Sequence, residues 1–151
     1  MKILLILFVF SFSYTSYSQT ELEYFKKGYE YYDKEYFNST IQQYTNAINI
    51  DPNFSLAYLN RALAKADLGD NRLAIMDINI ALKIVESNGG VWKHLNLLGG
   101  GTNQQRSASA YMIKAILKKK IGDNIGACSD VQIAATLNYE EFRDRVKKYC
   151  N

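Results

Sequence analysis

The stretch AYLNRALAKADLGD, residues 57–70, is repeated downstream as AYMIKAILKKKIGD, residues 110–123. The two copies are identical at six positions and keep a positive charge where Arg61 is replaced by Lys114. A weaker third copy, EYFKKGYEYYDKEY, precedes them at 23–36, and the step from it to the first copy is much shorter than the step between the two strong copies. A repeated unit therefore organises most of this chain, and one interval between its copies is unusually long.

The shorter step, a period of about 34 residues, and the order of large and small side chains within it resemble the tetratricopeptide repeat (TPR), a helix-turn-helix unit. The three copies cover residues 21–54, 55–88 and 108–139. The long interval is then one full repeat plus an insertion at 89–107. Two repeats depart from the family pattern, since lysine stands where the family has tyrosine, at Lys65 and Lys118.

This resemblance implies an all-α fold, a right-handed superhelical stack of three TPR helix pairs plus a C-terminal capping helix at 140–150. Residues that are mostly small recur where paired helices would cross, because close backbones exclude large side chains: Gly28, Ala62 and Ala115, then Thr40, Ala74 and Ala127. The expected capping helix carries one apolar stripe and one polar face, as the end of a stack requires: the stripe is Phe142, Val146, Tyr149 and Cys150. A generic helical bundle is the alternative, and the fixed period argues against it.

The first residues are typical of a secretory signal peptide. Lys2 is followed by the apolar run ILLILFVFSF and then by small residues, so we expect residues 1–18 to be cleaved near Ser18–Gln19. A membrane helix is the alternative, but it needs about 20 apolar residues, and this run is shorter. We therefore expect a single TPR domain, residues 19–151, exported to the periplasm or the extracellular space, with no stable membrane insertion.

The charge distribution argues against a nucleic-acid partner. The whole chain has a formal net charge of +3. Residues 19–90 carry 7 basic and 10 acidic side chains, and residues 91–151 carry 10 and 5. Nucleic-acid binding usually requires a dense basic stripe, and this polarisation is too weak for one.

The sequence offers little for catalysis, metal binding or a cofactor. His94 is the only histidine, so no multi-histidine metal cluster can form. No G-x-S-x-G elbow supports a nucleophilic triad built on His94. The glycines at 99–101 lack the Gly-Lys-Ser/Thr ending of a phosphate-binding loop. We therefore predict a protein that is not an enzyme, with no catalytic residues, no metal and no cofactor.

The chain has two cysteines, Cys128 in the third repeat and Cys150 at the end of the expected capping helix. An even number of cysteines in an exported chain favours a disulfide. The alternative is two small buried thiols. No C-x-x-C motif indicates a redox site.

In proteins that this chain resembles, the first helix of each repeat lines a concave groove. The residues that match those positions are Leu22, Phe25, Tyr29, Tyr32 and Asp33, then Leu56, Leu59, Leu63, Ala66 and Asp67, then Ser109, Met112, Ile116, Lys119 and Lys120. Such a groove suits a peptide held by side-chain anchors, with an acidic end near the lysines. The alternative is that these apolar side chains pack against the insertion or against a second copy in a homo-oligomer.

A subgroup of the family grips C-terminal carboxylates with a lysine and an asparagine in its first repeat. Phe25 and Tyr29 stand at those positions here, so that clamp is absent. Asn60 matches the clamp's middle asparagine, which is common in the family.

The insertion contains the only tryptophan, in VWKHLNLL, between Gly89–Gly90 and Gly99–Gly101. Long loops in compact domains are often functional, so a short helix or flap is one hypothesis. The other is a plug that fills the junction between the second and third repeats. We predict a non-catalytic exported module that binds a protein or peptide partner in the groove. The alternative function is a carrier of a small apolar ligand in a tyrosine-lined cavity covered by residues 89–107.

Overall fold

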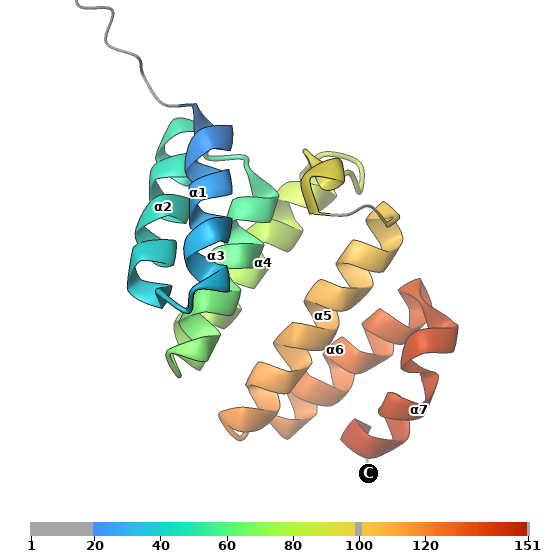
Figure 1. Cartoon of the computed structure of the whole chain (residues 1–151). Coiled ribbons are helices and arrows are strands. Elements are labelled where there is room, and N and C mark those ends of the chain that lie inside the picture. Colours follow the sequence, from blue (N-terminus) through green and yellow to red (C-terminus); the bar gives the residue numbers. More distant parts are fainter. Residues whose placement is uncertain (1–19, 99–100, 151) are drawn as a thin grey trace, which may run out of the picture.

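A computed structural model describes residues 20–98 and 101–150. The expected signal peptide and its cleavage point lie outside these residues. Within them the chain contains no strand, so the prediction of an all-α fold is confirmed. The helices in order are α1 (Glu21–Asp33), α2 (Phe37–Ile50), α3 (Ser55–Asp67), α4 (Asn71–Ser87), the short 3-10 helix η1 (Leu95–Leu98), α5 (Asn103–Lys120), α6 (Asn124–Leu137) and α7 (Tyr139–Cys150) (Figure 1).

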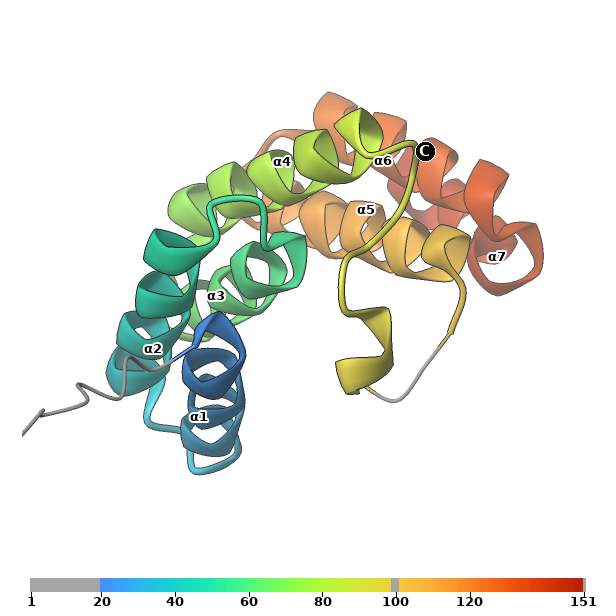
Figure 2. The same cartoon turned by 90° about the horizontal axis from the view of Figure 1, so that it is seen from above.

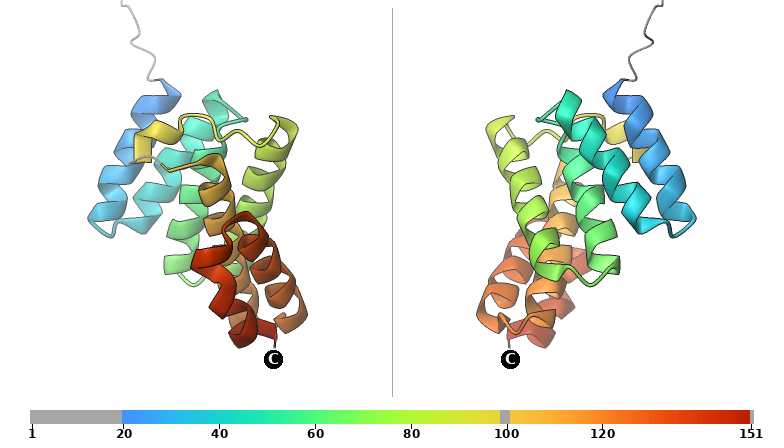
Figure 3. Two further views of the ribbon diagram at one scale, coloured as in Figure 1. Left: turned by 90° about the vertical axis from the view of Figure 1, so that its right-hand side faces the viewer. Right: turned by 90° about the vertical axis from the view of Figure 1, so that its left-hand side faces the viewer.

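The six long helices before α7 form three antiparallel pairs, α1 with α2, α3 with α4 and α5 with α6. The pairs stack into a curved, two-layered arch (Figures 1 and 2). Helices α1, α3 and α5 form the inner layer of the curve, and α2, α4 and α6 form the outer layer. Side views show the pairs stacked in chain order with α7 at the far end (Figure 3). We call the exposed side of the inner layer the inner face and that of the outer layer the outer face.

The turns inside the pairs follow from local chemistry. Gly69 and Gly122 have φ of 87° and 85°, the left-handed conformation that ends a helix at low cost for glycine. In the first pair Glu35 takes this conformation instead, with φ of 59°. The next helix then starts at an aspartate in two pairs: Asp123 accepts a 2.9 Å hydrogen bond from the N–H of Gly126, whereas Asp70 makes no side-chain capping bond.

Helix α5 begins earlier than the repeat pattern predicts. Thr102 caps it, with its hydroxyl 3.1 Å from the N–H of Gln105 and the Gln105 side chain 2.8 Å from the N–H of Thr102. This reciprocal pair is a capping box, which starts a helix at the next residue. Residues 103–107, which the repeat pattern places in the insertion, therefore belong to α5.

The core confirms that the small residues at the helix crossings are needed there. Ala62 and Ala115 are fully buried, and Gly28 lies beneath the ring of Tyr44. A Cβ atom at position 28 would lie 2.7 Å from Cε1 of Tyr44, closer than van der Waals contact allows. The pairing of α1 with α2 thus depends on a residue without a side chain.

Helix α7 covers the end of the stack, as the apolar stripe predicts. Phe142 is buried in the last core cluster, and Val146 and Tyr149 pack against that cluster. A disulfide joins Cys128 of α6 to Cys150 of α7, with their Cα atoms 4.8 Å apart. The disulfide hypothesis therefore holds, and the alternative of two buried thiols is wrong.

Candidate functional site

The residues predicted to line the groove lie on the inner-layer helices, but the structure divides them into a covered and an open set. Phe25, Leu56, Leu59 and Met112 are buried, with exposed fractions of 2%, 0%, 4% and 5%. The open set is exposed or half-exposed: Leu22, Tyr29, Tyr32, Asp33, Asn60, Leu63, Ala66, Asp67, Ser109, Ile116, Lys119 and Lys120.

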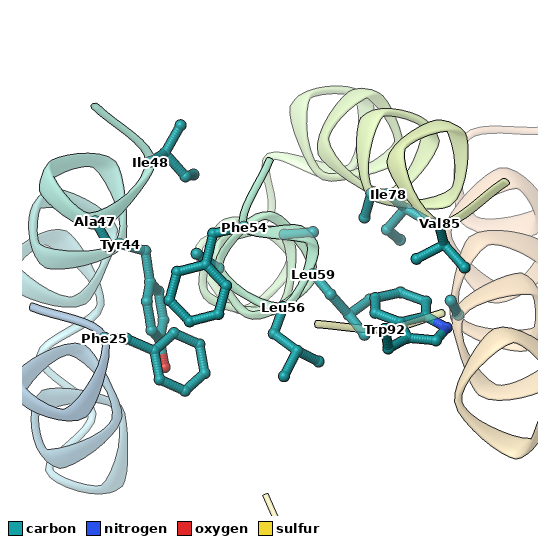
Figure 4. Close-up of a cluster of buried hydrophobic side chains, with 14 of the residues drawn as sticks. Phe25, Tyr44, Ala47, Ile48, Phe54, Leu56, Leu59, Ile78, Val85 and Trp92 are labelled. Carbon is teal, nitrogen blue, oxygen red and sulfur yellow. The ribbon is translucent and has the colours of Figure 1, made fainter. Parts of the chain in front are cut away.

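The insertion is one reason for this division, because it folds back onto the inner side of the arch (Figure 2). Trp92 is 1% exposed and belongs to the main core cluster. Its ring lies beside Leu59 and Val85, in the space between α3 and α5 (Figure 4). The insertion therefore fills the junction between the second and third repeats, as the plug hypothesis proposes.

Hydrogen bonds fix the tryptophan to the start of α5. Its indole Nε1–H donates to Oγ of Ser107 at 2.9 Å, and its backbone N–H donates to Oδ1 of Asn103 at 2.9 Å. Both N–H donors of this buried residue therefore have an acceptor, which a buried indole requires.

The next residues tie the insertion to the junction between the first and second repeats. Lys93 Nζ lies 2.8 Å from Oδ2 of Asp51, and the ring of His94 meets the ring of Phe54 edge-on at 5.1 Å. Burial alone would raise the pKa of the Asp51 carboxyl, but hydrogen bonds from Lys93 and from the N–H of Asn53, with the charge of Lys93, outweigh burial and lower that pKa. The ammonium of Lys93 thus favours the charged carboxylate.

The tyrosine-lined cavity expected beneath the insertion is occupied by core side chains. The ring of Phe25 packs against that of Tyr44 at 5.4 Å and against that of Phe54 at 4.9 Å (Figure 4). With Trp92 beside them, these rings form part of one continuous core. No observation on these side chains favours a bound small molecule.

The open part of the inner face lies toward the C-terminal ends of α1, α3 and α5. The plug contacts the N-terminal parts of α3 and α5, through Phe54 and Ser107, so it leaves the opposite ends uncovered. Tyr29, on the second half of α1, has 46% of its surface exposed. Leu63 and Ile116, in the second halves of α3 and α5, are partly buried and keep part of their surface exposed. An aromatic and apolar row therefore crosses the three helices.

The rim of this open region is polarised. At one end the hydroxyl of Tyr32 donates a 2.5 Å hydrogen bond to Asp67, and burial together with this bond raises the pKa of Tyr32 to about 12. At the other end Lys119 donates to the backbone carbonyl of Lys148 at 3.2 Å and stacks over the ring of Tyr149 at 4.7 Å. Lys119 is therefore held against α7, whereas Lys120, the last residue of α5, is exposed.

Two buried aspartates explain the lysines that depart from the family pattern. Asp77 of α4 forms ion pairs with two residues of α3, Arg61 at 2.8 Å and Lys65 at 2.6 Å. A buried carboxylate needs such partners, because desolvation penalises an unpaired charge.

The third repeat builds the same cluster from the matching positions of its own two helices. Asp130 of α6 lies 3.1 Å from Lys114 and 2.8 Å from Lys118, the latter an ion pair that is not aligned as a hydrogen bond. The first repeat has Tyr31 and Gln43 at the matching positions. The spacing of Asp77 and Asp130 is the signal in the sequence that could have revealed both clusters. The two ion clusters hold α4 against α3 and α6 against α5.

The described residues show few other features that could bind a ligand. Shallow pockets of about 280 and 350 Å³ lie at helix-pair turns, the first beside Gly69–Leu73 and the second beside Glu35–Ser39. In the ranges that the structure covers, no three His, Cys, Asp or Glu side chains gather as metal ligands do. In the same ranges, no helix has the length and apolar character that crossing a membrane requires.

No family model and no curated protein matches the chain. Solved structures do match it. The first TPR domain of Spaghetti (RPAP3), bound to the HSP90 peptide SRMEEVD, is 21% identical, with a TM-score of 0.69 over 88% of this chain and 92% of that one. The TPR2B domain of yeast Sti1 in complex with an Hsp70 peptide is 23% identical, with a TM-score of 0.66 over 86% and 95%. The Arabidopsis OM64 TPR domain is 20% identical, with a TM-score of 0.66 over 85% and 95%.

Proposed function

We propose that this chain, which has the fold of tetratricopeptide-repeat domains, is a non-catalytic module that binds a polypeptide partner on the open part of its inner face. The observation that carries the proposal is the row of Tyr29, Leu63 and Ile116, which stays accessible where the plug ends. Two of the similar structures hold chaperone peptides, the HSP90 peptide on RPAP3 and the Hsp70 peptide on Sti1.

The partner is a peptide segment that the inner face recognises by its side chains. Phe25 and Tyr29 replace the lysine and asparagine of the carboxylate clamp, so a free C-terminus has no equivalent anchor here. The accessible tyrosine and aliphatic side chains instead suit apolar anchors placed along an extended or helical segment. The polarised rim favours a basic group beside Asp67 and an acidic group beside Lys120.

The proposed site of action is outside the cytoplasm. The apolar run after Lys2 supports export, and the disulfide between Cys128 and Cys150 is the kind of bond that persists in oxidising compartments. A fusion of residues 1–18 to a periplasmic reporter tests this directly. A reporter that stays in the cytoplasm would contradict export.

The binding proposal is tested by selecting peptides from a random library on the purified chain and measuring their affinity by fluorescence anisotropy. Replacing Tyr29 or Leu63 by alanine should weaken the selected peptides by about 1–3 kcal/mol, which is roughly 5- to 150-fold, the usual loss for an interface anchor.

Tyr36→Ala is the matched control, because Tyr36 is also exposed, at 59% against 46% for Tyr29, but lies at the turn between α1 and α2. Its affinity should equal that of the wild type. If the selected peptides bind Tyr29→Ala and Leu63→Ala as tightly as the wild type, the inner face is not the site.

A further inference from the structure

The outer face carries exposed charge almost only on its middle helix. Helix α2 contains no charged residue, and the single charged residue of α6, Asp130, is buried and paired with Lys114 and Lys118 of α5. The exposed charges of the outer layer are therefore those of α4, which are Arg72, Lys83 and Glu86. Depletion of charge is the compositional mark of the centre of a protein interface.

Three exposed residues of α4 form one edge of that helix at regular two-turn intervals: Arg72, Asn79 and Glu86. Residues at this spacing stay on the same side of a helix, and the two charges are separated by about 21 Å along the axis. A second edge beside the first is apolar, with Leu73 47%, Met76 58% and Ile80 39% exposed. The exposed Lys83 lies between these two edges, seven residues after Met76. The outer side of α4 thus has one polar edge and one apolar edge, with a lysine between them.

Both charges on the polar edge oppose the dipole of α4. Arg72 is in the first turn, where the partial charge of the helix is positive, and Glu86 is in the last turn, where it is negative. Within the described part of the chain, neither residue forms an ion pair. Each therefore lacks a counter-charge that would offset its unfavourable position.

We propose that the outer face binds a second copy of this chain, with the two α4 helices antiparallel about a two-fold axis at Asn79. This arrangement places Arg72 of each copy opposite Glu86 of the other and brings Asn79 against its symmetry mate. It also brings the apolar edges together, since a two-fold axis perpendicular to the plane of the two helices pairs each edge with itself. A parallel pairing would place like charges opposite each other.

Other occupants fit this surface less well. A membrane surface is bound by faces rich in Lys and Arg, and the outer layer exposes only Arg72 and Lys83. A highly charged partner would find no dense complementary patch. The outer sides of three helices up to about 25 Å long and about 9 Å apart give a face of roughly 600 Å². This face is the outside of the curve, so two copies meet mainly along α4 and the contact is that of a weak association (Figure 2).

This association leaves both inner faces open. They lie on the far sides of the two copies, so the dimer presents two peptide sites at once. Two linked sites bind a repeated or clustered partner more tightly than one site does. The dimer itself does not depend on the proposed peptide binding.

Sedimentation equilibrium of the purified chain, from about 1 µM to about 1 mM, tests the proposal over the range of weak to moderate association. We expect the molar mass to rise toward that of a dimer. Arg72→Glu and Glu86→Arg should each raise the dissociation constant by about tenfold or more, because each change turns two attractive pairs into repulsive ones.

Mixing the two single variants is the decisive measurement. In the mixed dimer both charge pairs are again opposite in sign, so an equimolar mixture should recover the affinity that each variant has lost. Simple misfolding of either variant would not be rescued in this way. Ile80→Asp should abolish association, whereas Ile133→Asp, at the matching position of α6, should leave more of it.

A chain that remains monomeric over the whole range overturns the proposal. So does a pair of charge variants that associate as the wild type does. If each variant is weakened and the mixture stays weak, the antiparallel pairing through Arg72 and Glu86 is wrong.

Discussion

Replacing Trp92 by alanine should destabilise the whole domain, although the residue lies between helices in an insertion. An indole of this kind buries roughly 200 Å², and at about 25 cal/mol per Å² this transfer is worth about 5 kcal/mol. The hydrogen bond from Nε1 to Ser107 adds about 1 kcal/mol. The insertion can partly collapse into the space, so we expect a loss of about 3–5 kcal/mol, the range found for such truncations.

Urea unfolding followed by far-UV circular dichroism measures this loss directly. Trp92→Phe keeps a ring but loses the hydrogen bond, and it should cost about 1–2 kcal/mol. Val91→Ala is the matched control, because Val91 is the adjacent residue and is 50% exposed; it should change stability by about 0.5 kcal/mol or less. If Trp92→Ala costs no more than Val91→Ala, the insertion is a loose flap and its packing as a plug is refuted.

Three further changes test other parts of the structure. Reducing the disulfide between α6 and α7 should lower the free energy of unfolding by about 3 kcal/mol, the loop-closure entropy expected for two cysteines 22 residues apart. An unchanged melting temperature under reducing conditions would show that the disulfide does not stabilise the fold. Asp77→Ala leaves two partly buried cations, Arg61 and Lys65, without their carboxylate and should cost about 3–5 kcal/mol in urea unfolding. Replacing the exposed Asn79 by alanine should cost about 0.5 kcal/mol or less, and equal losses would refute a stabilising role for the cluster. Lys93→Ala should lower the urea midpoint at pH 7 but not at about pH 2, because folding lowers the pKa of the Asp51 carboxyl that Lys93 contacts. The stability that this ion pair contributes is present above the unfolded pKa of about 3.9 and is lost as pH falls through the folded pKa. A difference that persists in acid would exclude this ion pair as the cause.

The helical pairs were predictable because their signals are local. Gly69 and Gly122 end one helix by their own backbone preference, and Asp123 starts the next through a bond to the nearby Gly126. Thr102 and Gln105 also act locally, and their capping box marks the start of α5 more accurately than the repeat period does. Local rules of this kind can be read from one sequence.

The accessible part of the inner face could not be predicted in the same way. Phe25, Leu56 and Leu59 match positions that line a groove in related folds, yet here they are buried. The repeat pattern specifies which side of a helix these residues occupy. It does not specify that an insertion after the second repeat, far from them in the chain, returns to cover part of that side.

The buried ion clusters show the same limit. Lys65 and Lys118 look like departures from a family pattern, and their purpose is visible only when Asp77 and Asp130 lie opposite them on the paired helix. The sequence alone determined the helix pairs, their order and the residues at their turns, since these depend on spacing and backbone preference over a few residues. Only the tertiary structure decided where Trp92 lies and which side chains remain open to a partner, because burial depends on the fit between segments far apart in the chain.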